Sequence, residues 1–400
     1  MKQPFVSVSF LVNSQWIFSS NALLSKLNVK NKHHNLLKIS RRNCCCSASL
    51  IEEFQKKLNN GQVQEAFLLF KQLPSSSFSE VKSGFQLLNV VSTLVLKRHY
   101  SNQVQVAEVY DELKKKNCLK AFSVIDSEEK LPEPVRYFVN CVPVIIDLVS
   151  FAKSKQIGLD KLVETAKIPL EALRPRSQSI FSYQLAGVVF SLSLIFFSHL
   201  FHIENIIRPI GISLLVGFLC DQIALQGAIF EELYKNLFPI YKKKVLKHEA
   251  GHFLVSYLLG CPVRGIVLSA WESLSLGIPG QAGTLFFDRK LESELSTGFL
   301  TDATIDRYSI VLMAGIAAEA LEYGQAEGGQ SDEAALLRVL TCLNPPWSKE
   351  RVFNQARWAV LQAILIIKKQ KKAYDALVHA LSSKKPLGDC IAMIEANYEP

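Results

Sequence analysis

The sequence lacks the signatures of several large protein classes. None of its 19 glycines is followed by lysine, so the chain has no Walker A loop for a nucleoside triphosphate. Its nine cysteines form no C-x-x-C pair outside the run at residues 44–46, which argues against a disulfide framework and a thiolate zinc site. We therefore expect no P-loop ATPase module and cysteines that are reduced, ordinary residues.

Acidic residues are absent from the first 51 positions, which contain seven lysines or arginines. The net charge of the whole chain is +9, so removing this segment leaves +2 (9 − 7), and the basic excess does not indicate nucleic-acid binding. A basic, hydroxyl-rich segment without acids is typical of an organelle transit peptide. We predict one over residues 1–48, for a chloroplast rather than a mitochondrion because Ser and Asn are abundant. The alternative is a merely disordered N-terminus.

The region from residue 49 to residue 176 has the apolar spacing of helices. Leu50, Phe54 and Leu58 recur at helical intervals before a break at Gly61. No second copy of this pattern follows at a fixed period, so a repeat array is not indicated. We predict a soluble helical region that serves as a docking or spacer domain, and we assign no chemistry to it.

Charged residues are also missing from a long apolar run. Residues 177–203 contain no Lys, Arg, Asp or Glu, and about 20 apolar residues suffice to cross a bilayer. Residues 209–230 have a single charge, Asp221. The two runs predict a two-helix transmembrane hairpin within residues 177–232. For the second run a buried core helix or an interfacial segment is the alternative, because an acid near mid-span is costly. Basic residues flank both ends, so both ends are expected on one side of the membrane, the stroma in a chloroplast.

The chemical signal of the chain is the pentapeptide His248-Glu249-Ala250-Gly251-His252. It lies in a predicted helix over residues 239–259, which Gly260 ends. In a helix the two histidines stand one turn apart on the same face, where they can bind one Zn²⁺, and Glu249 is placed to take a proton from an attacking water. A catalytic zinc needs a third protein ligand. Core-packed histidines are the alternative.

Three downstream segments extend this motif into a resemblance. They are residues 261–267 (CPVRGIV), 312–319 (LMAGIAAE) and 328–332 (GGQSD). Together with residues 247–252 (KHEAGH) they resemble the peptidase domain of FtsH, the membrane-bound AAA+ zinc metalloprotease. The likeness covers roughly residues 240–398. In that family the last residue of G-A-S-N-D is the third zinc ligand, which implies Asp332 here. Asp332 could instead only cap a helix, and Glu319 is either a rival ligand or a group that orients a zinc histidine.

The resemblance implies a helical zinc metallopeptidase domain over residues 233–400, with His248, His252 and Asp332 as zinc ligands and Glu249 as catalytic base. The fold is expected to be mainly α, with a small β element near residues 263–287. Residues 283–287 are predicted as a strand that can pair with an extended peptide or simply pack.

The chain departs from FtsH because it has no ATPase module and no room for one between the apolar runs and the pentapeptide. We expect a membrane-anchored, ATP-independent endopeptidase of the thylakoid or envelope, facing the stroma. It would cut unfolded or exposed polypeptide segments unaided, or work with an ATPase-bearing FtsH subunit. The alternative is a non-proteolytic FtsH-like scaffold or assembly subunit of a chloroplast membrane complex.

Overall fold

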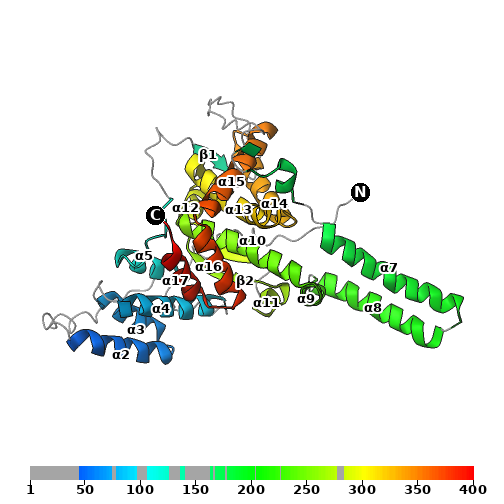
Figure 1. Ribbon diagram of the computed structural model, residues 1–400, viewed down its shortest axis with the longest axis horizontal. Coiled ribbons are helices and arrows are strands. Elements are labelled where there is room, and N and C mark those ends of the chain that lie inside the picture. The colour runs from blue at the N-terminus through cyan, green and yellow to red at the C-terminus, as the bar shows by residue number, and fades with distance from the viewer. Residues whose placement is uncertain are drawn as a thin grey trace.

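The structure is a computed structural model of a mainly helical chain, with two small sheets among the residues that it describes (Figure 1). It describes residues 45–73, 78–96, 106–125, 136–139, 163–164, 167–175, 178–202, 204–225, 227–276 and 283–400. The predicted mainly α fold is confirmed. The predicted transit peptide lies outside the described residues as far as position 44.

The N-terminal helices pack onto the C-terminal part of the chain. They are α2 (Cys45–Asn59), α3 (Val63–Gln72), α4 (Phe78–Leu96) and α5 (Val106–Lys115), with the break between α2 and α3 at Gly61, whose φ is 72°. Their apolar residues share one hydrophobic core with the C-terminal helices. Tyr110 Oη donates to the Val263 carbonyl at 3.0 Å, and Ala121 N donates to Glu395 Oε1 at 3.1 Å. Residues 233–400 therefore bury part of their surface against this region.

Two antiparallel sheets accompany the helices. The first pairs β2 (Val263–Val267) with β3 (Gly283–Phe286), which confirms the β element predicted near residues 263–287. The second has the order β4 (Phe299–Thr301), β1 (Arg136–Val139), β5 (Leu343–Asn344). β1 lies within residues 49–176, the region expected to be helical, and is a strand that this expectation did not include. Its pairing partners, such as Leu300 opposite Tyr137, are distant in sequence and leave no mark on local spacing.

Helices α7 (Gln178–Leu200) and α8 (Glu204–Ala224) lie side by side and project from the rest of the molecule (Figure 1). Large apolar side chains such as Phe190, Phe196 and Leu214 are exposed on them. By length and composition, residues 205–224 of α8 form the one described helix that could cross a membrane, while the apolar part of α7, residues 185–200, is shorter.

The second apolar run differs from the predicted residues 209–230, because α8 begins at Glu204 and ends at Ala224. Asp221 explains the difference. Its Oδ1 and Oδ2 accept from Ile229 N and Phe230 N, both at 3.0 Å, at the start of α9 (Ala228–Leu237). Gly227, with φ 79°, makes the turn between the helices. The acid that made the second run ambiguous therefore lies in the last turn of α8 and satisfies the backbone of the next helix.

Helix α10 (Pro239–Leu258) carries the pentapeptide, and its bounds agree with the predicted helix to within one residue. Every residue of α10 from His248 to Leu258 is buried. α10 packs on α13 and α16, and α13 also packs on α15. The bounds of the other helices are η1 (Leu170–Leu173), α11 (Ala270–Ser275), α12 (Arg289–Thr297), α13 (Asp302–Tyr323), α14 (Gln330–Thr341), α15 (Lys349–Lys369), α16 (Lys371–Ser382) and α17 (Leu387–Asn397).

Candidate metal centre

Two glycines allow α10 and α13 to approach closely at the pentapeptide. A Cβ on Gly251 would lie 2.6 Å from the Ala314 carbonyl oxygen, so only glycine fits at this crossing. On the facing helix, a Cβ on Gly315 would lie 2.3 Å from His248 Nε2 and 2.5 Å from His252 Nε2. The missing side chain of Gly315 therefore leaves a space directly beside both imidazoles.

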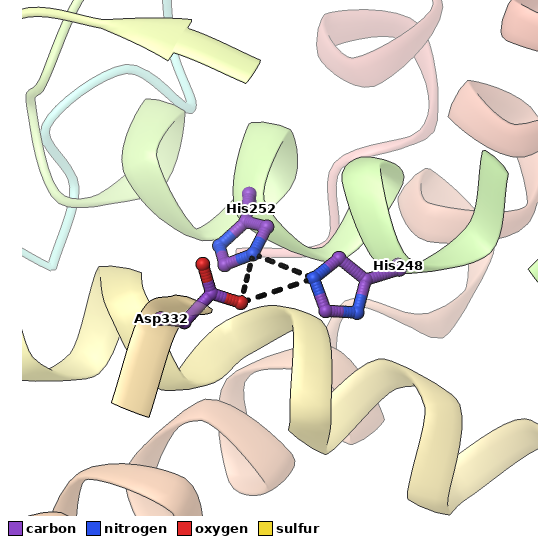
Figure 2. Close-up of side chains that lie close together, drawn as sticks. All are labelled: His248, His252 and Asp332. Carbon is purple, nitrogen blue, oxygen red and sulfur yellow. Dashed lines mark hydrogen bonds and ion pairs between the residues drawn. The ribbon is translucent and has the colours of Figure 1, made fainter. Parts of the chain in front are cut away.

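Three electron-rich atoms converge on that space (Figure 2). His248 Nε2 and His252 Nε2 are 3.1 Å apart, and Asp332 Oδ2 lies 3.1 Å from the first and 3.3 Å from the second. Tetrahedral ligands at roughly 2.0–2.1 Å from a zinc ion stand about 3.3–3.4 Å apart. The triangle therefore has the dimensions of one face of a tetrahedral site, and these three buried residues could hold a metal ion.

The outer nitrogen of each imidazole has a fixed partner. His252 Nδ1 lies 2.8 Å from the Val311 carbonyl oxygen, and His248 Nδ1 lies 2.8 Å from Glu319 Oε1. A carbonyl or a carboxylate accepts, so each Nδ1 carries the proton and donates. In a neutral ring this leaves the Nε2 lone pair pointing at Asp332 Oδ2. Three lone pairs facing one another require a cation between them, either protons or a metal.

Without a metal, the pKa values of His248 and Asp332 shift in opposite directions, which also favours a cation between them. Burial acts to lower the pKa of His248, but hydrogen bonds to Asp332 and Glu319 outweigh it and raise this pKa well above its usual range. Burial acts to raise the pKa of Asp332, but the facing His252 and His248 outweigh it and lower this pKa below its usual range. Without a metal, the site holds an ionised Asp332 beside a protonated imidazole.

Glu319 lies behind His248 and outside the triangle. Its Oε2 accepts from Glu327 N at 2.7 Å and Gly328 N at 3.0 Å, in the loop that leads to Asp332. Of the two roles predicted for Glu319, its contacts fit the one in which it orients the His248 ring rather than the one in which it joins the triangle. Asp332 does not cap α14, because Gly329 occupies the cap position and no side chain bonds there.

Glu249 is buried next to the triangle, and its carboxylate is held by a contact that was not predicted from the sequence. The hydroxyl of Thr284, in β3, donates to Glu249 Oε2 at 2.9 Å and lies 3.1 Å from the Glu249 carbonyl oxygen. Thr284 is the only fully buried position of β3. In the sequence, the available indication of this contact was that Thr284 lies in a segment predicted to form a strand beside the pentapeptide.

A buried ion pair fixes β3 relative to α13. Arg307 donates from Nε to Asp288 Oδ2 at 2.8 Å and from Nη2 to Asp288 Oδ1 at 2.7 Å. Asp288 follows β3 closely and also accepts from Lys290 N and Leu291 N at the start of α12. Such a bidentate pair has a defined geometry. The ion pair therefore supports the position of Thr284, and Thr284 in turn holds Glu249.

No protein-family model matches the chain, and no curated protein or solved structure is significantly similar to it.

Proposed function

We propose that the chain is a membrane-anchored, zinc-dependent endopeptidase of the FtsH type. It hydrolyses peptide bonds of membrane or unfolded proteins in the chloroplast, without an ATPase motor of its own. The observation that carries the proposal is the triangle of His248 Nε2, His252 Nε2 and Asp332 Oδ2, with separations of 3.1–3.3 Å, beside a buried Glu249.

The donor set supports zinc as the ion. Two imidazoles and one carboxylate make a three-ligand site with an open fourth position, the arrangement of many catalytic zinc centres. Magnesium and calcium prefer oxygen donors alone. The same donor set also serves non-haem iron. The carboxylate of Glu249, adjacent in sequence to the first imidazole and fixed by Thr284, favours hydrolysis because that reaction needs a general base.

The residues around the centre have distinct tasks in such a reaction. A bound zinc ion supplies Lewis acidity, which activates water at neutral pH and polarises a carbonyl group. Glu249 would take a proton from the attacking water and pass it to the leaving amine. Thr284 would hold the Glu249 carboxylate in position for both transfers. Glu319 and the Val311 carbonyl keep both imidazoles in the tautomer that presents Nε2.

A peptide substrate would bind along β3. This strand pairs with β2 on one edge, and no other strand of the described residues pairs with its second edge. An extended peptide adds readily to a free strand edge by main-chain hydrogen bonds. Thr284 belongs to β3, so a peptide bound there would run beside Glu249.

The hairpin of α7 and α8 is proposed to span the thylakoid or envelope membrane. Its exposed apolar side chains and the length of α8 support this role. His248 follows Pro239 by nine residues of helix, about 14 Å. The peptidase site would thus lie near the membrane surface, on the stromal side by the charge pattern of the sequence. An ATPase-bearing FtsH subunit is a proposed partner for folded substrates.

The test is zinc content and casein cleavage, without ATP, by the purified full-length chain in detergent. The whole chain is needed because the N-terminal helices share the core of residues 233–400. Glu249→Gln should keep one zinc per chain and lose cleavage by about 10²–10⁴-fold. Glu53→Gln, an exposed acid on α2, is the matched control and should cleave like the wild type. Bound zinc with equal cleavage in Glu249→Gln, or with no cleavage in any variant, would favour the scaffold alternative.

A further inference from the structure

Exposed apolar side chains continue from the hairpin onto α9. Ile229, Leu233 and Leu237 are 50%, 55% and 65% exposed and recur every four residues, so they form one stripe along the helix. The opposite side of α9 buries Tyr234 and Lys235. A helix on the surface of a water-soluble protein normally turns its apolar stripe inward. α9 turns this stripe outward, which indicates that something covers it.

The exposed charges on the segment that carries this stripe are of one sign. Among the described residues from 223 to 243, the exposed charged side chains are Lys242 and Lys243. The acids near the stripe are turned inward or paired: Asp221 bonds the start of α9, Glu231 forms an ion pair with the buried Lys235, and Glu232 is half-buried with its Oε2 inside. An apolar stripe bordered by lysines is the pattern of a helix that lies in the interface of an anionic membrane.

An exposed tryptophan lies on a helix that packs against α9. Trp271, on the short helix α11, is 50% exposed, and α11 packs against α9. The neighbouring Glu272 is exposed, but its carboxylate accepts from Leu268 N at 3.1 Å. Tryptophan is enriched at the level of the lipid headgroups because its ring is apolar and its N–H is polar. Figure 1 shows α9 and α11 at the base of the hairpin, where α8 returns to the rest of the molecule.

We infer that this surface, defined as the exposed side of α9 together with Ile240, Lys242, Lys243 and Trp271, lies in the headgroup layer of a bilayer. The occupant is a lipid surface because α9 follows the apolar α8 after a short turn, and Ile223 in the last turn of α8 is also exposed. The inference rests on the membrane role of the hairpin in the proposed function and is independent of peptidase activity. Because α10 begins at Pro239, directly after α9, this surface would fix the height of the metal centre above the membrane.

The experiment uses tryptophan quenching in vesicles. The full chain is reconstituted into anionic vesicles whose lipids carry bromine either near the headgroup end or near the middle of the acyl chain. The signal of Trp271 is the difference between the wild type and Trp271→Phe. A second reporter is Leu233→Trp in the Trp271→Phe background. Interfacial helices bury their apolar face roughly 5–10 Å into the headgroup boundary. Both reporters should therefore lose more fluorescence to the shallow bromine than to the deep bromine.

The matched control is Leu68→Trp in the Trp271→Phe background. Leu68 is an exposed apolar residue on α3, which lies away from the hairpin in Figure 1, so this reporter should not be quenched. If the protein floats with the vesicles but neither Trp271 nor the Leu233→Trp reporter is quenched, the inference is overturned while membrane insertion of the hairpin stands. If the protein does not float with the vesicles, both the membrane insertion of the hairpin and the inference are refuted. Casein cleavage in detergent tests the peptidase separately.

Discussion

Replacing Gly315 by alanine should abolish metal binding although it removes no ligand. The new Cβ would lie 2.3 Å from His248 Nε2 and 2.5 Å from His252 Nε2. A zinc ion bound to these atoms would sit at roughly 2.0–2.1 Å from each. The methyl group and the ion would therefore compete for the same space beside α13.

The two effects of this substitution differ in size. Overpacking costs about 1–3 kcal/mol, and alanine in place of glycine within a helix returns about 1 kcal/mol. The free energy of unfolding of the metal-free protein should thus fall by no more than about 2 kcal/mol. In the wild type, free zinc at about 1,000 times its Kd should add about 4 kcal/mol. In Gly315→Ala that gain should vanish.

The assay combines zinc content after dialysis with thermal unfolding, with and without added zinc. Gly217→Ala is the matched control, because a Cβ at Gly217 in α8 meets nothing within 4 Å. It should bind zinc like the wild type. One zinc per chain in Gly315→Ala, with an undiminished stabilisation by zinc, would mean that the ion does not bind between the two imidazoles.

Three further predictions concern the triangle and its neighbours. Glu319→Gln should weaken zinc binding by about 10–100-fold in competition with a chelator, because the orientation of His248 is loosened; an unchanged affinity would exclude that role. Thr284→Val should keep zinc but lower kcat by about tenfold or more, since a hydrogen bond to a charged group contributes about 1.5–3 kcal/mol, and Thr284→Ser should restore most of it. Full activity in Thr284→Val would remove Thr284 from the mechanism. The raised pKa of His248 makes the metal-free protein lose stability as pH rises from about 6.5 through that raised pKa, because the folded state then releases a proton that the unfolded state has already lost. The stability of the zinc-bound protein should stay level over the same range, since its imidazoles are deprotonated as zinc requires and the unfolded state has already lost its proton, so the stabilisation by zinc grows with pH. Unfolding at several pH values, with zinc or with a chelator, measures both slopes, and parallel slopes would contradict the assignment.

The sequence could predict those parts of the centre that local spacing determines. His248 and His252 share one helix, so the helical period alone puts them on one face, and α10 has the predicted bounds to within one residue. Asp332 is 80 residues beyond His252, and only the resemblance to FtsH singled it out. The structure brings its carboxylate to within 3.3 Å of both rings.

The parts that could not be predicted depend on contacts between distant residues. The hydrogen bond from Thr284 to Glu249 and the ion pair of Asp288 with Arg307 join separate elements, so neither leaves a periodic trace. The end of α8 was missed because the role of Asp221 depends on how α9 turns back toward it. Each of these features follows from packing that is settled only when the whole core forms.

The central claim is that two imidazoles and one carboxylate hold a single divalent ion. X-ray absorption at the zinc edge of the purified full-length chain tests it most directly. The spectrum should show four nitrogen or oxygen neighbours at about 2.0–2.1 Å, two of them imidazoles. His252→Ala should remove one imidazole or all bound zinc. Sulfur neighbours at about 2.3 Å, or a wild-type chain that binds no zinc, would contradict the account.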